Sequence, residues 1–284
     1  MPIDAKRSRL MFRKLGRELT KLARKPAPEN VHGFRTISRR VEALLMEVIP
    51  EHHRNDEKLL KLLARLRKKA GRVRDLDVQI AALRDLKIPG GNGHKSQLLN
   101  ALVEERAKRE QKLAKAFDRE TAAEIRKRIK RATSQMNIPS HTEPLTLTLN
   151  KLAQLGRDHA PVTEKILHQY RIIGKRARYI AELAGPDAQA ERVVEQLKHM
   201  QDVIGNWHDW LKLTEKAEEL LGEVRESALV AMLRNVTQAK FRQSLDAVAE
   251  IRAALAANAS GARSGSVPSR KPSTKEAAAR AAVA

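Results

Sequence analysis

The spacing of apolar residues predicts a chain that is almost entirely helical. Leucine, isoleucine and valine recur at intervals of three and four residues with charged residues between them, as expected for amphipathic α-helices. Clusters of proline and glycine interrupt this pattern, for example IPGGNG at 88–93. We therefore expect eight helices, at residues 3–25, 29–48, 55–86, 97–133, 145–158, 162–184, 188–221 and 225–257.

The second half of the chain repeats features of the first half in the same order. The segment VHGFRTISRRVEAL at 31–44 is echoed by LHQYRIIGKRARYI at 167–180, and LGR occurs at both 15–17 and 155–157. Gly71, Arg74 and Asp75 correspond in the same way to Gly205, His208 and Asp209. The sequence predicts an all-α fold of two four-helix bundles, residues 1–136 and 137–257, related by a pseudo-twofold axis.

The two echoed segments each carry a basic stripe. Because successive helical residues turn by about 100°, His32, Arg35 and Arg39 share one side of a helix. By the same spacing, His168, Arg171 and Lys175 form a second stripe that continues to Arg178. The apolar residues that anchor the stripes are Val31, Phe34, Val41, Leu44 and Leu45 in the first segment and Leu167, Ile172, Ile173 and Ile180 in the second.

Composition agrees with helices and narrows the class of protein. Aromatic residues make up 3% of the 284 residues, which argues against an all-β fold, and 42% hydrophobic residues can build a sizeable core. No run of about 18 apolar residues predicts a membrane span, and the N-terminus lacks the pattern of a signal peptide. The absence of cysteine excludes disulfide and thiolate chemistry and is compatible with a reducing cytoplasm.

The formal net charge of +22 points to a polyanionic partner, because self-repulsion on this scale opposes a compact state. Nucleic acid, an anionic membrane surface and inorganic phosphate polymers all satisfy this requirement. Residues 258–284 are expected to be a disordered basic tail, since they contain few large apolar residues. This tail holds only a small part of the excess charge, so most of the charge belongs to the folded part.

The third and seventh predicted helices carry a glycine within a basic face. Gly71 lies between Arg67 and Arg74, and Gly205 lies among Lys198, His208 and Lys212. A glycine inside a helix costs about 1 kcal/mol relative to alanine, so something is expected to approach the backbone there. The sequence leaves two explanations open, close packing of another helix and close approach of an anion.

Four further residues invite a chemical interpretation. Asp75 and Asp209 could each orient an arginine or histidine through a charge-assisted hydrogen bond, or form an ordinary helix ion pair. His32 and His168 could be structural, metal-binding or anion-binding residues. The surrounding arginines and lysines disfavour a metal cation and favour an anion.

These segments, together with GRVRDLDV at 71–78 and IGNWHDW at 204–210, resemble the paired motifs of the CHAD domain, the conserved histidine α-helical domain. The resemblance covers residues 1–257. It implies an eight-helix pseudo-symmetric fold around a central basic pore that binds inorganic polyphosphate, in a cytoplasmic protein that in some members is found at polyphosphate granules. Lys175 departs from the first copy, where Arg39 stands, and Glu42 stands opposite Arg178.

We therefore expect non-enzymatic binding of polyphosphate in a basic channel, with no cofactor, no metal and no catalytic residue. The chain has no GxxxxGK loop and no HExxH motif. A nucleic-acid binder is the main alternative, although stacking aromatics are few and scattered. A phosphohydrolase or phosphohistidine protein is the second alternative. The candidate ligand-binding residues are His32, Arg35, Arg39, Arg40, Arg67, Arg74, His168, Arg171, Lys175, Arg176, Arg178, Lys198, His208, Lys212, Arg13 and Arg17.

Overall fold

The computed structural model describes residues 3, 5–49, 53–88, 93–139, 142–156, 161–222 and 227–264. Within these ranges the chain is all-helical and contains no strand, as expected. The first half comprises α1 (Ala5–Arg24), α2 (Pro28–Ala43) with the short π-helix η1 (Leu44–Val48), α3 (Arg54–Asp85), α4 (Gly93–Ala116) and α5 (Arg119–Gln135). The second half comprises α6 (Pro144–Gly156), α7 (Glu164–Ala181), α8 (Ala188–Leu221) and α9 (Ala228–Ser264).

The predicted helix at 97–133 is wrong as a single element, because it is divided between α4 and α5. The side chain of Asp118 accepts a hydrogen bond from the backbone amide of Thr121 at 2.7 Å and so caps a new helix. The change of direction lets Ile125 and Ile129 of α5 pack into the core beside α1 and α3. The described residues therefore contain nine α-helices rather than eight.

Two other boundaries differ from the sequence prediction. The last helix, α9, continues through Asn258 to Ser264, into the segment expected to be a tail, and residues 265–284 lie outside the described residues. At the end of α8, Gly222 has a φ of 63°, a backbone conformation that glycine adopts without a steric penalty. Among the described helices, none is long and apolar enough to cross a membrane.

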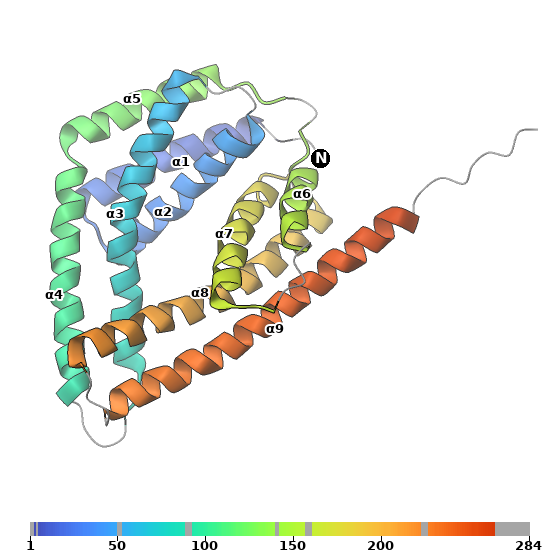
Figure 1. Cartoon of the computed structure of the whole chain (residues 1–284). Coiled ribbons are helices and arrows are strands. Elements are labelled where there is room, and N and C mark those ends of the chain that lie inside the picture. The colour runs from blue at the N-terminus through green and yellow to red at the C-terminus, as the bar shows by residue number, and fades with distance from the viewer. Residues whose placement is uncertain are drawn as a thin grey trace, which may run out of the picture.

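Each half has its own apolar core, and the two halves meet at two further apolar clusters. At one meeting point, Ala43 of α2 packs against Tyr179 and Ile180 of α7. At the other, the C-terminal parts of α3 and α8 pack together with α4 and the start of α9, through residues that include Leu83 and Leu213. Figure 1 shows this second contact at the far ends of α3, α4 and α8. The contacts α2–α7 and α3–α8 join helices that correspond to each other in the two halves.

Corresponding positions also make corresponding hydrogen bonds. In the first half, Arg67 Nη1 of α3 donates to the carbonyl oxygen of Ser38 in α2 at 3.2 Å. In the second half, Gln201 Nε2 of α8 donates to the carbonyl oxygen of Gly174 in α7 at 2.8 Å. Ser38 and Gly174 are equivalent in the sequence repeat, so the pairs α2–α3 and α7–α8 share this contact.

Candidate functional site

The apolar sides of α2 and α7 are buried in the two cores and fix the direction of the basic stripes. Phe34 of α2 and Tyr170 of α7 occupy equivalent positions and are both fully buried. Arg35 and Arg39 are consequently half-buried on another side of α2, as are Arg171 and Lys175 on α7. One predicted anchor is wrong, because the side chain of Ile172 is 42% exposed.

The structure brings the two stripes together with residues from α3 and α8. Burial lowers the pKa of Lys175 to about 7, and the positive charges of Arg171, Arg39 and Arg35 add to this effect. Asp209 of α8 acts in the opposite direction and partly offsets it. The central charged site is defined by residues that influence one another's charge across both halves: Arg35, Arg39, Asp75, Arg171, Lys175, His208 and Asp209, with His32, Arg74 and His168 at its edges.

Arg35 explains the glycine of α3. Its Nη1 donates a hydrogen bond to the carbonyl oxygen of Arg67 at 3.1 Å, and a Cβ at Gly71 would lie 2.3 Å from the same nitrogen. Gly71 therefore lets a side chain of α2 lie across α3, which agrees with the first of the two explanations, close packing of another helix. Burial lowers the pKa of Arg35, and Asp75 opposes that shift.

Asp75 and Asp209 line a cavity of about 460 Å³ together with His208. Burial raises the pKa of Asp75; Arg35, Arg171 and His208 oppose that rise, whereas the negative charge of Asp209 adds to it. Asp209 Oδ1 lies 3.6 Å from His208 Nδ1, which is too long for the predicted orienting hydrogen bond. The two carboxylates therefore act on the site through their charge.

His32 and His168 lie at the edges of the central charged site, and both are exposed. The pKa of His32 is lowered by burial and by Arg74 and Arg35. The pKa of His168 is lowered by burial and then by Arg171, His208 and Lys175. The free protein therefore holds both imidazoles neutral at pH 7.

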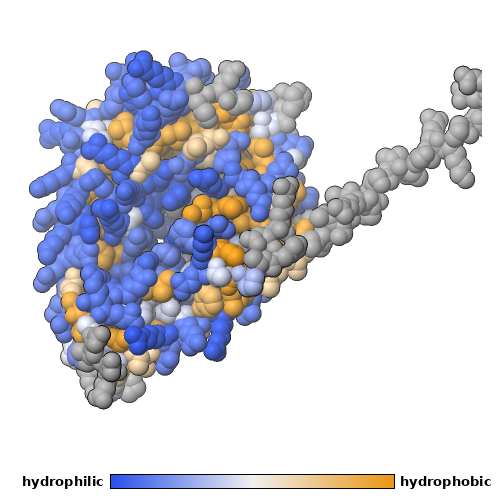
Figure 2. Space-filling view, viewed as in Figure 1, coloured by the Kyte–Doolittle hydropathy of each residue, from blue (hydrophilic) through white to orange (hydrophobic). Residues whose placement is uncertain are grey.

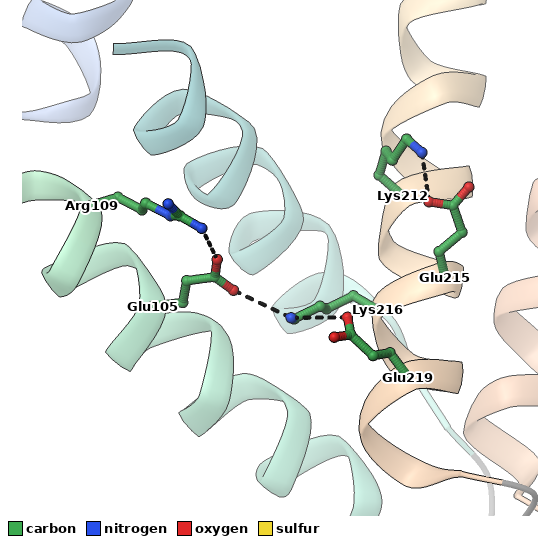
Figure 3. Close-up of polar contacts among 6 residues, drawn as sticks. All are labelled: Glu105, Arg109, Lys212, Glu215, Lys216 and Glu219. Carbon is green, nitrogen blue, oxygen red and sulfur yellow. Dashed lines mark hydrogen bonds and ion pairs between the residues drawn. The ribbon is translucent and has the colours of Figure 1, made fainter. Parts of the chain in front are cut away.

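Ion pairs extend from the cavity of about 460 Å³ to α4 (Figure 3). The sequence prediction did not include any residue of α4 in the site. Glu105 of α4 accepts a hydrogen bond from Arg109 at 2.9 Å and pairs with Lys216 of α8 at 3.4 Å. Lys216 also pairs with Glu219, and the predicted ligand residue Lys212 pairs with Glu215 at 2.6 Å. No sequence repeat marks α4, so the only available signal was its i, i+4 pairing of acids and bases.

Several predicted ligand residues lie outside the central charged site. Arg67 is only 7% exposed, and its guanidinium group forms an ion pair with Glu42. Arg40 pairs with Glu182 at 2.6 Å, and Arg178 pairs with the same carboxylate at 3.7 Å.

Arg40 and Lys198 line a separate cavity of about 580 Å³ where the C-terminal end of α7 meets α1 and α8. Arg176 is exposed and lines a small recess beside Arg39 and Lys175. Arg13 and Arg17 are exposed on α1, which packs on α2 and α5. The sequence stripes are thus divided between one shared site and several surface positions.

The face in Figure 2 is predominantly hydrophilic and is hollowed near its centre, between the two halves. Among the described residues, no group of three or more His, Cys, Asp or Glu side chains is arranged to hold a metal ion. The arrangement brings cationic side chains from α2 and α7 into one site.

Comparison with known proteins places this fold in a family. The family model for the CHAD domain matches residues 8–218, a shorter range than the expected 1–257 that ends within α8. Two solved structures are similar: the CHAD domain from the plant Ricinus communis (TM-score 0.66, 17% identity, 87% of this chain and 88% of that chain) and PptA from Streptomyces chartreusis (TM-score 0.65, 16% identity, 90% and 99%). No curated protein matches the sequence. Because the family model spans most of its length, the chain belongs to the CHAD domain family.

Proposed function

We propose that the central charged site binds inorganic polyphosphate without chemical turnover. The observation that carries this proposal is the gathering of Arg35, Arg39, Arg171 and Lys175 in a partly buried site, where burial and then the neighbouring positive charges lower the pKa of Lys175 to about 7. Like charges held this close destabilise the free protein, and an anion bound between them relieves the repulsion. Membership of the CHAD family supports a polyphosphate-related function.

A linear polyanion suits this site better than a single phosphate. Residues 32 and 39 are separated by about 10 Å along α2, at 1.5 Å per residue, so one stripe can contact successive phosphates. Arginine can fork onto two phosphate oxygens, while lysine acts as a point charge. The stripe on α7 provides a second set of cations to the same chain.

The burial of the aromatic residues argues against nucleic acid as the main ligand. Trp207, Tyr170 and Phe34 are at most 3% exposed, and Trp210 packs against the apolar cluster that joins the halves. Stacking on exposed aromatic rings contributes much of single-strand binding, and these rings cannot provide it. We therefore rank nucleic acid as a competing polyanion.

Charge reversal of both stripes tests the proposal. We expect Arg39→Glu combined with Lys175→Glu to abolish binding of polyphosphate in a calorimetric titration, while circular dichroism shows unchanged helicity. Arg126→Glu combined with Lys127→Glu, at exposed positions of α5, changes the net charge equally and serves as the control. Equal loss in both double variants would mean that net charge, not this site, drives binding.

Two further measurements separate the alternatives. In a competition assay with polyphosphate of defined lengths, single-stranded RNA and DNA should not displace the polyphosphate. Tighter binding of RNA would favour the nucleic-acid alternative. Binding should weaken steeply with salt, since each phosphate contact releases counterions. Release of orthophosphate, measured with and without a divalent metal, would contradict the non-enzymatic proposal.

A further inference from the structure

The solvent-facing side of α1 carries cations and no exposed acidic residue. The one acidic residue of this helix, Glu18, is buried and pairs with Lys21 at 2.9 Å. Within the described part of the chain, Arg13, Lys14 and Arg17 form no ion pair. The exposed basic residues of α1 are Lys6, Arg7, Arg9, Arg13, Lys14, Arg17, Lys21 and Arg24.

The fold does not require these charges, because the equivalent helix of the second half lacks them. The repeat of LGR at 15–17 and 155–157 makes α6 the counterpart of α1. Three buried positions match: Ser8, Phe12 and Leu15 in α1, and Thr148, Leu152 and Leu155 in α6. At the exposed positions, Arg13 and Lys14 stand opposite Ala153 and Gln154, and every exposed residue described on α6 between 144 and 155 is uncharged.

The central charged site does not use the cations of α1 either. The main charges that act on the pKa values of Arg35, Asp75 and Lys175 lie on α2, α3, α7 and α8. The apolar side of α1 packs on α2 and α5, so its basic side points away from these two helices. This basic side therefore fits a second anionic partner.

Leu10 indicates which anion meets this surface. Its side chain is 46% exposed, and the turn of about 100° per residue places it between Arg17 and Lys21, within the basic side. A phosphate polymer or a nucleic-acid backbone offers a leucine no apolar contact. A bilayer with anionic headgroups offers charges at its surface and acyl chains just beneath it, so it suits both the cations and Leu10.

We propose that α1 is a peripheral membrane-contact surface that lies flat on an anionic bilayer. Arg13, Lys14 and Arg17 contact the lipid headgroups, and Leu10 enters the boundary between headgroups and acyl chains. The cations from Arg9 to Arg24 extend over about 22 Å of helix, at 1.5 Å per residue, and a flat layer of headgroups can meet them together. This surface shares no residue with the central charged site.

Exchanging exposed residues of α1 for their α6 counterparts tests the proposal. Sedimentation with vesicles should show binding to phosphatidylcholine mixed with phosphatidylglycerol and none to phosphatidylcholine alone. Arg13→Ala combined with Lys14→Gln should weaken binding about 25-fold, since each cation near an anionic bilayer contributes about fivefold. Arg126→Ala combined with Lys127→Gln, on α5, removes the same charge and should retain most of the affinity. Equal losses in both double variants would overturn the proposal.

Leu10→Asn, again the α6 counterpart, separates a bilayer from a polar polyanion. It leaves the charge unchanged and should weaken vesicle binding about fivefold, because it removes the apolar contact. Unchanged affinity, with helicity preserved in circular dichroism, would overturn the membrane contact.

Calorimetry with polyphosphate separates this proposal from the proposed function. Arg13→Ala combined with Lys14→Gln should bind polyphosphate as the wild type does, and a loss of that binding would overturn the assignment of α1 to a separate partner. Failure of the wild type to bind anionic vesicles would overturn the membrane contact and leave the proposed function standing.

Discussion

The two halves of this protein repeat the same sequence motifs but use the charges of these motifs differently. In the first half, Arg67 bonds to the Ser38 carbonyl oxygen and pairs with Glu42, which also lies 3.8 Å from Arg39. In the second half, a neutral glutamine makes the equivalent backbone hydrogen bond. Among the described residues, Arg171 and Lys175 form no salt bridge. Glu42 thus partly neutralises Arg39 on α2, whereas Arg171 and Lys175 on α7 have no carboxylate partner among the described residues.

This difference gives the halves separate roles in one site. A cation already paired with a carboxylate must exchange that partner for a phosphate, so its net gain on binding is small. A crowded cation without such a partner gains more. The second half should therefore supply most of the affinity, while the first half supplies a rigid opposing wall.

The largest expected effect is on the free energy of unfolding when either of the two equivalent hydrogen bonds is removed. Arg67→Ala should lower the free energy of unfolding by about 3 kcal/mol, because it leaves Glu42 and the Ser38 carbonyl oxygen without their partner. Gln201→Ala should cost about 1.5 kcal/mol, since it removes one neutral hydrogen bond and some packing. Urea denaturation measures both values, and equal costs would contradict the asymmetry.

The next effect is on the pH dependence of affinity, because the second copy has Lys175 where the first copy has Arg39. The pKa of Lys175 is about 7 in the free protein, and a bound polyanion raises it, so binding takes up a proton. Wild-type affinity should be highest below pH 7 and should fall as the pH rises from 7 towards 9. The total loss of affinity is about tenfold for each unit by which the bound polyanion raises the pKa of Lys175.

Lys175→Arg makes this position equal to its counterpart in the first half and keeps the charge at all these pH values. Its affinity should stay nearly constant between pH 7 and 9, as measured by titration in buffers of fixed ionic strength. The same decline in wild type and variant would assign the pH dependence to other groups. The lowered pKa values of His32 and His168 place their contribution below pH 6.5.

A smaller effect compares the two glycines in the absence of ligand. Gly205→Ala should stabilise the protein by up to about 1 kcal/mol, because the added methyl group meets no described atom and alanine favours the helix. Gly71→Ala should give little or no stabilisation, since it displaces the Arg35 guanidinium from its hydrogen bond. Thermal unfolding of both variants measures the difference, and equal stabilisation would mean that the contact of Arg35 is weak.

The smallest expected effect is the loss of stability when an ion pair between α4 of the first half and α8 of the second half is removed. Glu105→Gln removes the ion pair with Lys216 and should cost about 0.5 kcal/mol, because both side chains are about one-third exposed. The cost should shrink in 1 M salt, where surface ion pairs are screened. A loss of several kcal/mol would show that this ion pair, rather than the apolar cluster of α3, α4, α8 and α9, holds the halves together.

The sequence was most informative where the chemistry is local. The apolar spacing predicted the helices, because a helix that buries one side needs apolar residues at intervals of three and four. It failed at Asp118, where a single capping residue divides a long helix and the pattern of apolar residues on either side stays helical. It also could not show that Arg67 and Arg40 pair with carboxylates of the protein, since basic residues in a stripe look alike until their acidic partners are known.

The sequence by itself determined an all-helical chain, its CHAD motifs, its excess of positive charge and the stripes on α2 and α7. Only the tertiary structure decided which cations face one another, because that depends on how α2 packs on α7 and α3 on α8. It also gave the two glycines different meanings. Gly71 accommodates Arg35 and Gly205 leaves α8 accessible, and this distinction depends on the direction of side chains from another helix, which no spacing along one helix records.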